Sequence, residues 1–250
     1  MKFQQKLDAI VAKNNSLLCV GLDSTVDEQF TFNKTIIDAT QDLVCAYKPN
    51  SAFYEARGAQ GITELKMTCD YLREAYPDIP IILDAKRGDI GSTNEGYVAY
   101  AFDYLGVDAI TLHPYLGCEA LQPFLARKDK GCIILCRTSN PGATEFQDAL
   151  YRTVAEHVVH EWNTNGNCLL VVGAPYPEEL AIVRRIVGDM ILLVPGIGTQ
   201  GGDVEKTVKA GRNAKGSGMI INASRSIILS ENAREEARIV RDEINNYRHT

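Results

Sequence analysis

The sequence predicts an α/β fold, specifically one (β/α)8 barrel that extends over residues 1–250 as a single domain. Short apolar segments alternate with helix-like segments eight times in 250 residues, a common length for this barrel. The apolar segments are nearly continuous, as in parallel strands covered on both faces. Polar or glycine-rich groups follow nearly every segment, and such barrels carry their chemistry at the C-terminal strand ends. A doubly wound open sheet is the alternative, although it seldom needs eight strands at this length.

The first half of the chain contains four of the expected units. Apolar residues at positions 3, 7, 10 and 11 have helical spacing and predict an opening amphipathic helix. We expect strands at 17–22, 44–47, 81–83 and 107–112, and helices at 36–44, 62–75 and 97–105. Pro77 and Pro80 mark the turn into the third strand, and Gly106 is a typical C-terminal stop for the helix before the fourth.

The second half repeats the pattern. We expect strands at 132–136, 168–172, 190–194 and 219–221, and helices at 119–127, 149–162, 204–210 and 233–247. A further helix begins near Pro177, which suits a first-turn position, and Glu178 and Glu179 are favourable near its N-terminal dipole.

Composition restricts the possible functions. With 26 basic and 32 acidic residues the net charge is −6, and no basic tract stands out, so we expect no nucleic-acid binding. No apolar run approaches membrane-spanning length, so we expect no membrane association. The seven cysteines include no C-x-x-C pair and fall mainly in apolar segments, which predicts reduced thiols and a cytoplasmic location.

The stretch from Ile81 to Ser92 concentrates charge at the end of the third strand. Asp84 and Lys86 are two residues apart, so both side chains leave one face of the strand, and Asp89 follows on the loop. Ser92 is expected to cap the next helix, with Glu95 completing a capping box. Such charges cost desolvation unless they pair or act on a ligand. A structural ion pair is the alternative.

Other strand ends contribute further polar groups to the same rim. They are Asp23, Lys48, Asn50, His113, Ser139, the loop 195–202 and Arg225. Lys48 beside Asp84 would give the alternating charge order Lys48, Asp84, Lys86, Asp89, which keeps each charge partnered.

Residues 196–201 match the pattern G-x-G-x-x-G, but they follow the seventh strand, and no acid lies about 20 residues beyond them to bind a ribose. After the seventh strand of a barrel, glycine-lined amides instead form a phosphate site. Arg225 on the eighth loop can add a bidentate contact. A tight turn with a surface arginine is the alternative.

Four segments of the chain, together with the strand ends, resemble the orotidine 5′-monophosphate decarboxylase family over nearly the whole length. They are Lys48-Pro49-Asn50, the run from Asp84 to Gly91 (DAKRGDIG), the run from Thr138 to Gly142 (TSNPG) and the run from Pro195 to Asp203 (PGIGTQGGD). The D-x-K-x-x-D core is shared with other sugar-phosphate barrels, whereas the last two segments narrow the resemblance to this family. The resemblance implies decarboxylation of orotidine 5′-monophosphate to uridine 5′-monophosphate without a cofactor or metal.

The resemblance also implies residue roles. Lys86 would stabilise and protonate the C6 carbanion, within a catalytic set completed by Asp84, Asp89 and Lys48. Asp23 and Lys48 would hold the ribose hydroxyls, and Ser139 would bond the pyrimidine edge. The substrate-binding set would comprise Asp23, Asn50, Ile90, Thr93, Ser139, Pro195, Gln200, Gly201, Ser224 and Arg225, with Gln200 and Arg225 on the phosphate. In the family's homodimer, Asp89 and Thr93 would reach into the neighbouring subunit's site.

Two other functions remain open at this point. A metal-dependent sugar-phosphate enzyme on the same barrel would need extra acids or histidines at strand ends, and no such set is evident. His157, His160 and Glu161 match no zinc motif and suit a solvated helix face. A catalytically silent nucleotide-binding protein is the other possibility, and the intact Asp84, Lys86 and Asp89 disfavour it.

Overall fold

The computed structural model of the chain, described here for residues 1–197 and 202–248, contains one sheet of eight parallel strands. The strands are β1 (Leu18–Leu22), β2 (Ala46–Pro49), β3 (Ile82–Arg87), β4 (Ala109–Leu112), β5 (Gly131–Arg137), β6 (Cys168–Val172), β7 (Leu192–Pro195) and β8 (Met219–Ala223). Their order is β2-β1-β8-β7-β6-β5-β4-β3, and isolated parallel bridges join Tyr47 to Ile81 and Asn50 to Asp84. Because these bridges join β2 to β3, the sheet closes on itself and the predicted TIM barrel is confirmed.

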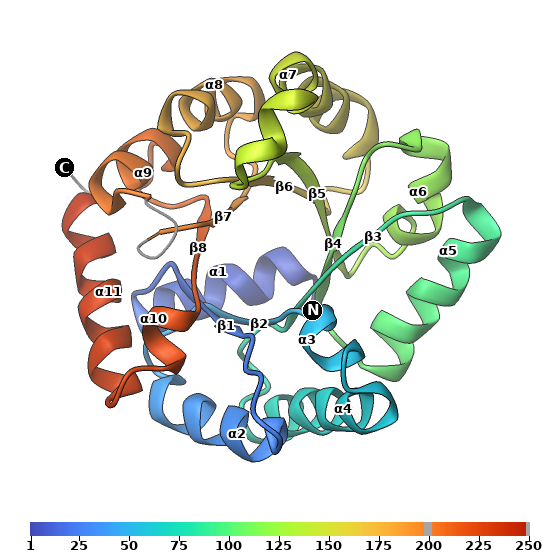
Figure 1. Ribbon diagram of the computed structural model, residues 1–250. Helices are drawn as coiled ribbons and strands as arrows, with labels where there is room; N and C mark the ends of the chain where they lie inside the picture. The colour runs from blue at the N-terminus through green and yellow to red at the C-terminus, as the bar shows by residue number, and fades with distance from the viewer. Residues whose placement is uncertain (198–201, 249–250) are drawn as a thin grey trace.

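Helices surround the strands in a ring, and α1 crosses behind them at the opposite end from α3 and α10 (Figure 1). The α-helices are α1 (Phe3–Asn14), α2 (Gln29–Thr40), α3 (Ser51–Glu55), α4 (Gly58–Ala75), α5 (Gly91–Val98), α6 (Gly117–Leu125), α7 (Gln147–His157), α8 (Pro177–Val187), α9 (Val204–Gly211), α10 (Arg225–Ile228) and α11 (Ala233–Arg248). A 3-10 segment, η2 (Pro141–Glu145), precedes α7, and the π-helical segments η1 (Ala99–Tyr104) and η3 (Val158–Trp162) extend α5 and α7.

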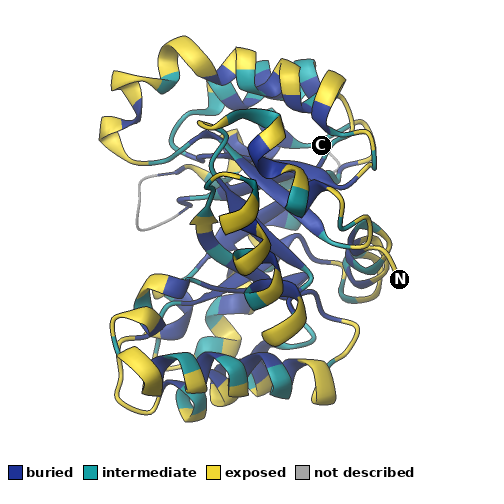
Figure 2. Ribbon diagram, turned by 90° about the vertical axis from the view of Figure 1, so that its right-hand side faces the viewer, coloured by how far each residue is buried: buried dark blue, intermediate teal, exposed yellow. Residues whose placement is uncertain are grey.

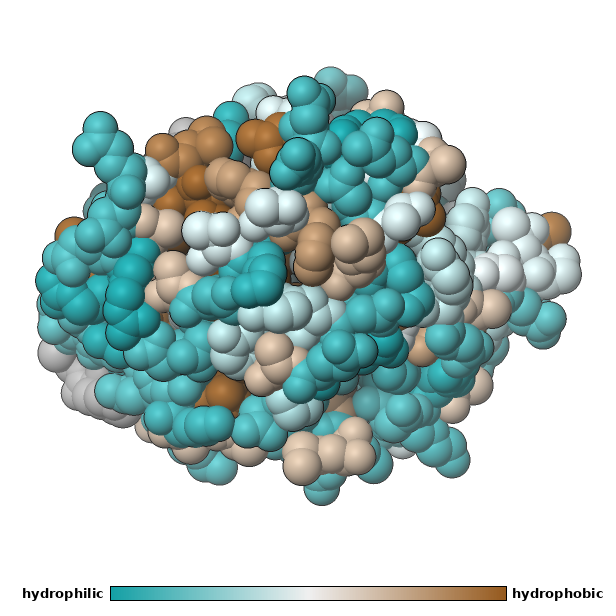
Figure 3. Space-filling model, turned by 90° about the horizontal axis from the view of Figure 1, so that it is seen from below, coloured by the Kyte–Doolittle hydropathy of each residue, from teal (hydrophilic) through white to brown (hydrophobic). Residues whose placement is uncertain are grey.

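The core lies between the strands and the inner faces of the helices. Every residue of β1 and β6 is buried, which explains their continuous apolar sequences. Figure 2 shows buried strands enclosed by helices whose outer faces are exposed. The face formed by α2 and α4 is mainly hydrophilic (Figure 3), as expected for helices that bury only one side. Within the described ranges, no helix is both long and apolar enough to cross a membrane.

Several element boundaries differ from the predicted ones because buried polar residues extend the elements. The helix expected at 36–44 begins at Gln29, whose amide is buried and donates to the carbonyl oxygen of Ser24. Apolar periodicity alone could not indicate this turn. The second strand lies at Ala46–Pro49, so Lys48 is inside the strand, and the short helices α3 and α10 were not predicted.

The predicted Ser92 cap is wrong. Helix α5 begins at Gly91 after Ile90, which makes no side-chain cap bond, and Ser92 is exposed in the first turn. The buried amide of Asn94 fixes the preceding loop instead, because it accepts from the backbone N–H of Asp89 and donates to the carbonyl oxygen of Ala120. Asn94, a residue inside the helix, therefore makes the side-chain hydrogen bonds at the start of α5 that the predicted capping box assigned to Ser92.

Candidate active site

Strands β2 and β3 bring two ammonium groups onto one carboxylate at the C-terminal end of the barrel. Asp84 accepts from Lys48 Nζ at 2.8 Å through Oδ2 and from Lys86 Nζ at 2.6 Å through Oδ1. The side chains of Lys48 and Asp84 are 4% and 12% exposed, whereas that of Lys86 is 49% exposed. The structure thus confirms the predicted contacts of Asp84 and leaves Lys86 as the accessible cation.

Thr111, which the sequence analysis did not identify, holds this arrangement together. Its hydroxyl lies on β4, is buried, and donates to Asp84 Oδ1 at 2.9 Å. Thr111 Oγ1 also accepts hydrogen bonds from the backbone N–H groups of Ala85 and Lys86. A threonine within the apolar strand Ala109–Leu112 was the available sequence signal, since a buried hydroxyl needs a partner.

The backbone at Lys86 adopts an uncommon conformation. Its φ is +50°, in the left-handed region that residues other than glycine rarely occupy. The pairing of β3 with β4 also shifts register between Leu83 and Arg87, so a bulge surrounds Asp84 and Lys86. Such strain costs about 1–3 kcal/mol and is concentrated at functional sites, where the surrounding contacts enforce it.

The shared carboxylate determines the protonation of the cluster. Burial alone would raise the pKa of Asp84, but the Lys48 and Lys86 ammonium groups outweigh burial and hold that pKa well below its ordinary value. Burial alone would lower the pKa of Lys48, but Asp84 and Asp23 outweigh it and raise that pKa. Asp84 is therefore a carboxylate and Lys48 an ammonium at neutral pH, so the site presents fixed charges.

Asp23 follows β1 and adds a second carboxylate beside Lys48. Its Oδ1 atom is buried and has no hydrogen-bond partner in the described part of the chain, which is unusual for a carboxylate. The neighbouring Gly21 leaves room for it, because a Cβ there would lie 2.9 Å from Asp23 Oδ2 and 2.8 Å from Ser224 Cβ. An acceptor in this environment is suited to bind a hydroxyl of a ligand.

The loop after β3 carries three more predicted residues but keeps them apart from the cluster. Asp89 Oδ1 accepts from the backbone N–H of Ile90 at 2.7 Å, and no ion pair joins Asp89 to Lys86 within residues 1–197 and 202–248. Ile90 is 62% exposed, and Thr93 is exposed in the first turn of α5. The fourth member of the predicted charge series therefore does not join the other three within one chain.

The remaining predicted residues occupy separate strand ends. Asn50 caps α3 by accepting from the N–H of Ala52, and Pro195 is the last residue of β7. Ser139 lies on the loop after β5, Ser224 Oγ donates to the carbonyl oxygen of Gly21, and Arg225 is exposed at the start of α10. Gln200 and Gly201 lie outside the described residues.

His113 and His157 each have a hydrogen-bond partner within the chain, and neither belongs to the charge cluster. His113 is hydrogen-bonded to backbone groups, since its Nε2 lies 2.8 Å from the carbonyl oxygen of Gly88 and its Nδ1 accepts from Tyr115 N–H. His157 pairs with Glu161 on an exposed helix face. Among the described residues, no group of three or more His, Cys, Asp or Glu side chains is placed to hold a metal ion.

A closed parallel barrel with a strained lysine, a largely buried aspartate shared by two lysines, and polar groups at successive strand ends defines a (β/α)8 enzyme. The family model described as the orotidine 5′-phosphate decarboxylase / HUMPS family matches residues 16–240, so the chain belongs to this family. Its full-length curated relatives carry the name of a carboxy-lyase, which places the chain among these enzymes.

Two such relatives and two solved structures illustrate the similarity. The chain is 49% identical to orotidine 5′-phosphate decarboxylase of Janthinobacterium sp. (strain Marseille), covering 99% of each chain. It is 48% identical to that of Ralstonia pickettii (strain 12J), covering 99% of this chain and all of the relative. The Leishmania donovani OMP decarboxylase structure matches all of both chains with a TM-score of 0.93 and 40% identity. The L. donovani UMP synthase structure has a TM-score of 0.95 and 42% identity; the match covers 99% of this chain but only 57% of the synthase.

Proposed function

We propose that residues 1–250 act as one catalytic domain that decarboxylates orotidine 5′-monophosphate to uridine 5′-monophosphate and CO2, the last step of de novo UMP synthesis, without a cofactor. The observation that carries this proposal is the Lys48–Asp84–Lys86 cluster. In it, Lys86 has a strained backbone, and its accessible ammonium is held beside a largely buried carboxylate. The names of the curated relatives and of the matching structures support the same reaction.

In this reaction the bond between C6 of the pyrimidine and its carboxylate breaks, and the electron pair remains on C6. The Lys86 ammonium then stabilises the developing carbanion and donates a proton to it. Because that charge exists only near the transition state, a fixed ammonium favours the transition state over the bound substrate. Asp84 keeps Lys86 oriented through the 2.6 Å contact and lies near the departing carboxylate.

The rest of the nucleotide would be bound at the other strand ends. Asp23 Oδ1, which has no hydrogen-bond partner among the described residues, suits the ribose hydroxyls together with Lys48, and Ser139 suits the pyrimidine edge. Arg225 suits the phosphate, together with its neighbour Ser224 and with Gln200 and Gly201 of the loop after β7, while Asn50, Ile90 and Pro195 complete the rim. Phosphate binding far from C6 would supply energy that is used at the reacting carbon.

A second copy of the chain would complete each site. Asp89 and Thr93 do not contact the charge cluster of their own chain, and the exposed apolar residues Ile90, Tyr115 and Leu116 lie on the two adjacent loops. We therefore propose a homodimer in which Asp89 and Thr93 enter the partner's site.

The buried free cysteines support a cytoplasmic location, where thiols remain reduced.

The direct test is to incubate the purified chain with orotidine 5′-monophosphate in EDTA and to follow the loss of its ultraviolet absorbance. Conversion to uridine 5′-monophosphate at the same rate with and without EDTA is the expected result. Turnover that disappears in EDTA would indicate a metal-dependent reaction. Binding of uridine 5′-monophosphate without any turnover would instead identify a catalytically silent nucleotide-binding protein.

A further inference from the structure

A buried arginine holds the loop after β5 from outside the barrel. Arg137 is the last residue of β5 and is 1% exposed. Its Nη2 lies 3.0 Å from Asp148 Oδ1 in the first turn of α7 and 3.8 Å from Glu179 Oε1 in α8. Its guanidinium lies 3.9 Å from the ring centroid of Tyr176, at the start of α8. One side chain therefore joins three elements beside the loop.

The same elements hold the loop on both sides of Ser139. The backbone N–H of Thr138 donates to Gln147 Oε1 at 2.7 Å, and Gln147 adjoins Asp148. The hydroxyl of Tyr176 donates to the carbonyl oxygen of Asn140 at 3.3 Å. Thr138 is thus bonded to the neighbour of Asp148, and Asn140 is bonded to Tyr176. Both Asp148 and Tyr176 contact Arg137.

Glycine at position 173 lets this loop pack directly on the end of β6. A Cβ at that position would lie 2.8 Å from the Cα of Ser139. The backbone of Ser139 therefore has a fixed support behind it, in addition to the ties at residues 138 and 140.

The fold itself does not require a guanidinium at this position. Nε and Nη1 of Arg137 have no hydrogen-bond partner among the residues that the structure describes, and incomplete bonding of a buried cation is costly. A methionine of similar length would fill the space. It would leave Asp148, whose side chain is 58% exposed, in contact with water. Glu179, whose side chain is 26% exposed, also keeps contact with water, so the substitution leaves no fully buried carboxylate unpaired.

We propose that Arg137 is a positioning residue for pyrimidine recognition, acting through Tyr176 and Asp148 on the backbone of Ser139. This inference rests on the proposed function, because it takes Ser139 to bond the pyrimidine edge. Arg137 itself does not contact the nucleotide. Its guanidinium sets the geometry of the residue that does.

The first test compares two ligands that differ by the pyrimidine. The Arg137→Met variant is expected to bind uridine 5′-monophosphate about tenfold more weakly, the size expected for one neutral hydrogen bond, while its affinity for ribose 5-phosphate is unchanged. The matched control is Arg152→Met, which removes an exposed arginine of α7 with its own tyrosine contact and should change neither affinity. Equal weakening of both ligands, or loss of the folded state, would overturn the proposal.

The second test is a double-mutant cycle with Ser139→Ala. If Arg137 acts through Ser139, the double variant should bind uridine 5′-monophosphate no more weakly than Ser139→Ala alone, whereas additive losses would overturn the inference. Tyr176→Phe keeps the ring under the guanidinium and removes the bond to Asn140, so it should give a smaller loss of the same kind. A wild-type chain that binds the nucleotide without decarboxylating it would refute the proposed function alone, since this cycle measures binding.

Discussion

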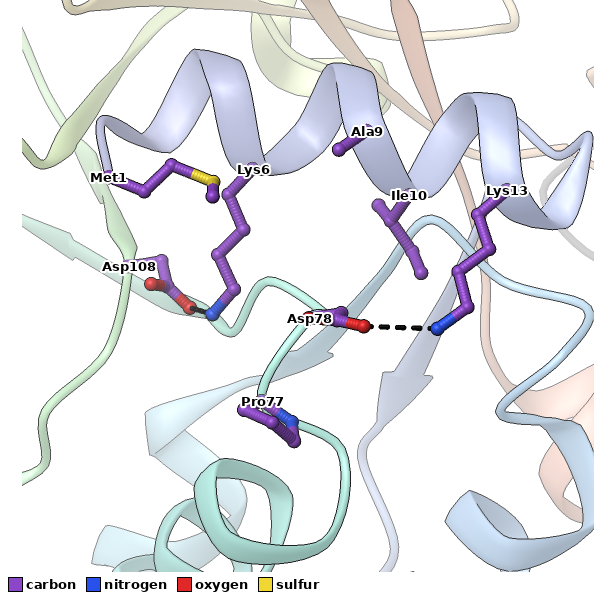
Figure 4. A pocket seen from close by; sticks show the side chains of 8 residues that line it. All are labelled: Met1, Lys6, Ala9, Ile10, Lys13, Pro77, Asp78 and Asp108. Carbon is purple, nitrogen blue, oxygen red and sulfur yellow. Dashed lines mark hydrogen bonds and ion pairs between the residues drawn. The ribbon is translucent and has the colours of Figure 1, made fainter.

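Lysine–aspartate pairs lie at both ends of this barrel, and only one set has the properties of an active site. At the N-terminal end, helix α1 places Lys6 beside Asp108 at 2.9 Å and Lys13 beside Asp78 at 3.0 Å, around a cavity of about 410 Å³ (Figure 4). These distances are close to the 2.6 and 2.8 Å of the Lys86 and Lys48 contacts with Asp84. Contact distance alone therefore does not separate the two regions.

The two ends differ in stoichiometry and backbone strain, whereas burial does not separate them, because Asp108 is 19% and Asp84 12% exposed. Each lysine beside the cavity contacts one aspartate, and the Lys13–Asp78 pair is more than 60% exposed, so water screens it. At the other end a single, largely buried aspartate contacts two lysines, and Lys86 has a left-handed backbone. A shared carboxylate, a buried Lys48 ammonium and a strained backbone at Lys86 are costly together, and such features are concentrated at sites that act on a ligand. The less exposed Lys6–Asp108 pair, satisfied one to one, stabilises α1 on the barrel.

The largest expected effect comes from removing Lys86. The Lys86→Ala variant should lower kcat for orotidine 5′-monophosphate by at least about 10³-fold, while uridine 5′-monophosphate still binds. Alanine retains a Cβ, so the strain at φ +50° persists and folding should change little. Steady-state kinetics and calorimetric titration give the two readouts. Lys6→Ala, which removes a lysine at the other end of the barrel, is the matched control. Turnover near the wild-type rate in Lys86→Ala would contradict the distinction between the two ends.

The next effect is on stability and depends on pH. Asp84→Asn leaves the buried Lys48 ammonium without its carboxylate, which should cost about 3 kcal/mol of unfolding free energy at pH 7. The pKa of Asp84 is lowered in the folded state, so its contribution is fully present above the ordinary value of 3.8 and is lost as the pH falls through the lower folded value. Denaturant titrations from pH 7 to pH 3 should show the wild-type advantage shrinking only below about pH 4. If the difference in unfolding free energy between the wild type and Asp84→Asn narrowed between pH 7 and 5, the lowered pKa of Asp84 would be contradicted.

A smaller effect is expected at Thr111, because it supports the cluster without carrying charge. Thr111→Val keeps the shape but removes the hydroxyl that Asp84, Ala85 N–H and Lys86 N–H share. We expect kcat to fall about tenfold and unfolding free energy to fall by about 1–3 kcal/mol, because buried N–H groups lose their acceptor. Thr111→Ser retains the hydroxyl and should recover most of the activity. A Thr111→Val enzyme as active as the wild type would show that Lys86 does not need this support.

The contrast between the two ends also shows what the sequence could reveal. Eight apolar segments predicted the barrel, and strand ends placed Asp84 beside Lys86, because periodicity and topology are local or repeating signals. Thr111 and Arg137 were not identified, because their roles depend on neighbours brought together from other strands and helices. The Ser92 cap was wrong for a related reason, since Asn94 gains a partner at Ala120 that no local pattern contains. The contact between Lys6 and Asp108 likewise spans 102 positions in the sequence.

The smallest effect is expected at the N-terminal end, where it isolates structural from catalytic pairing. Lys6→Met removes the ammonium, but Asp108 Oδ2 still accepts from the backbone N–H of Ile81 and remains partly exposed to water. We therefore expect a loss of about 1 kcal/mol of unfolding free energy and no change in kcat or KM. Lys13→Met, at the more exposed pair, should be indistinguishable from the wild type in both measurements. Since β3 begins at Ile82, next to Ile81, a lower kcat in Lys6→Met would mean that the two ends of the strand are coupled, and the division between them would fail.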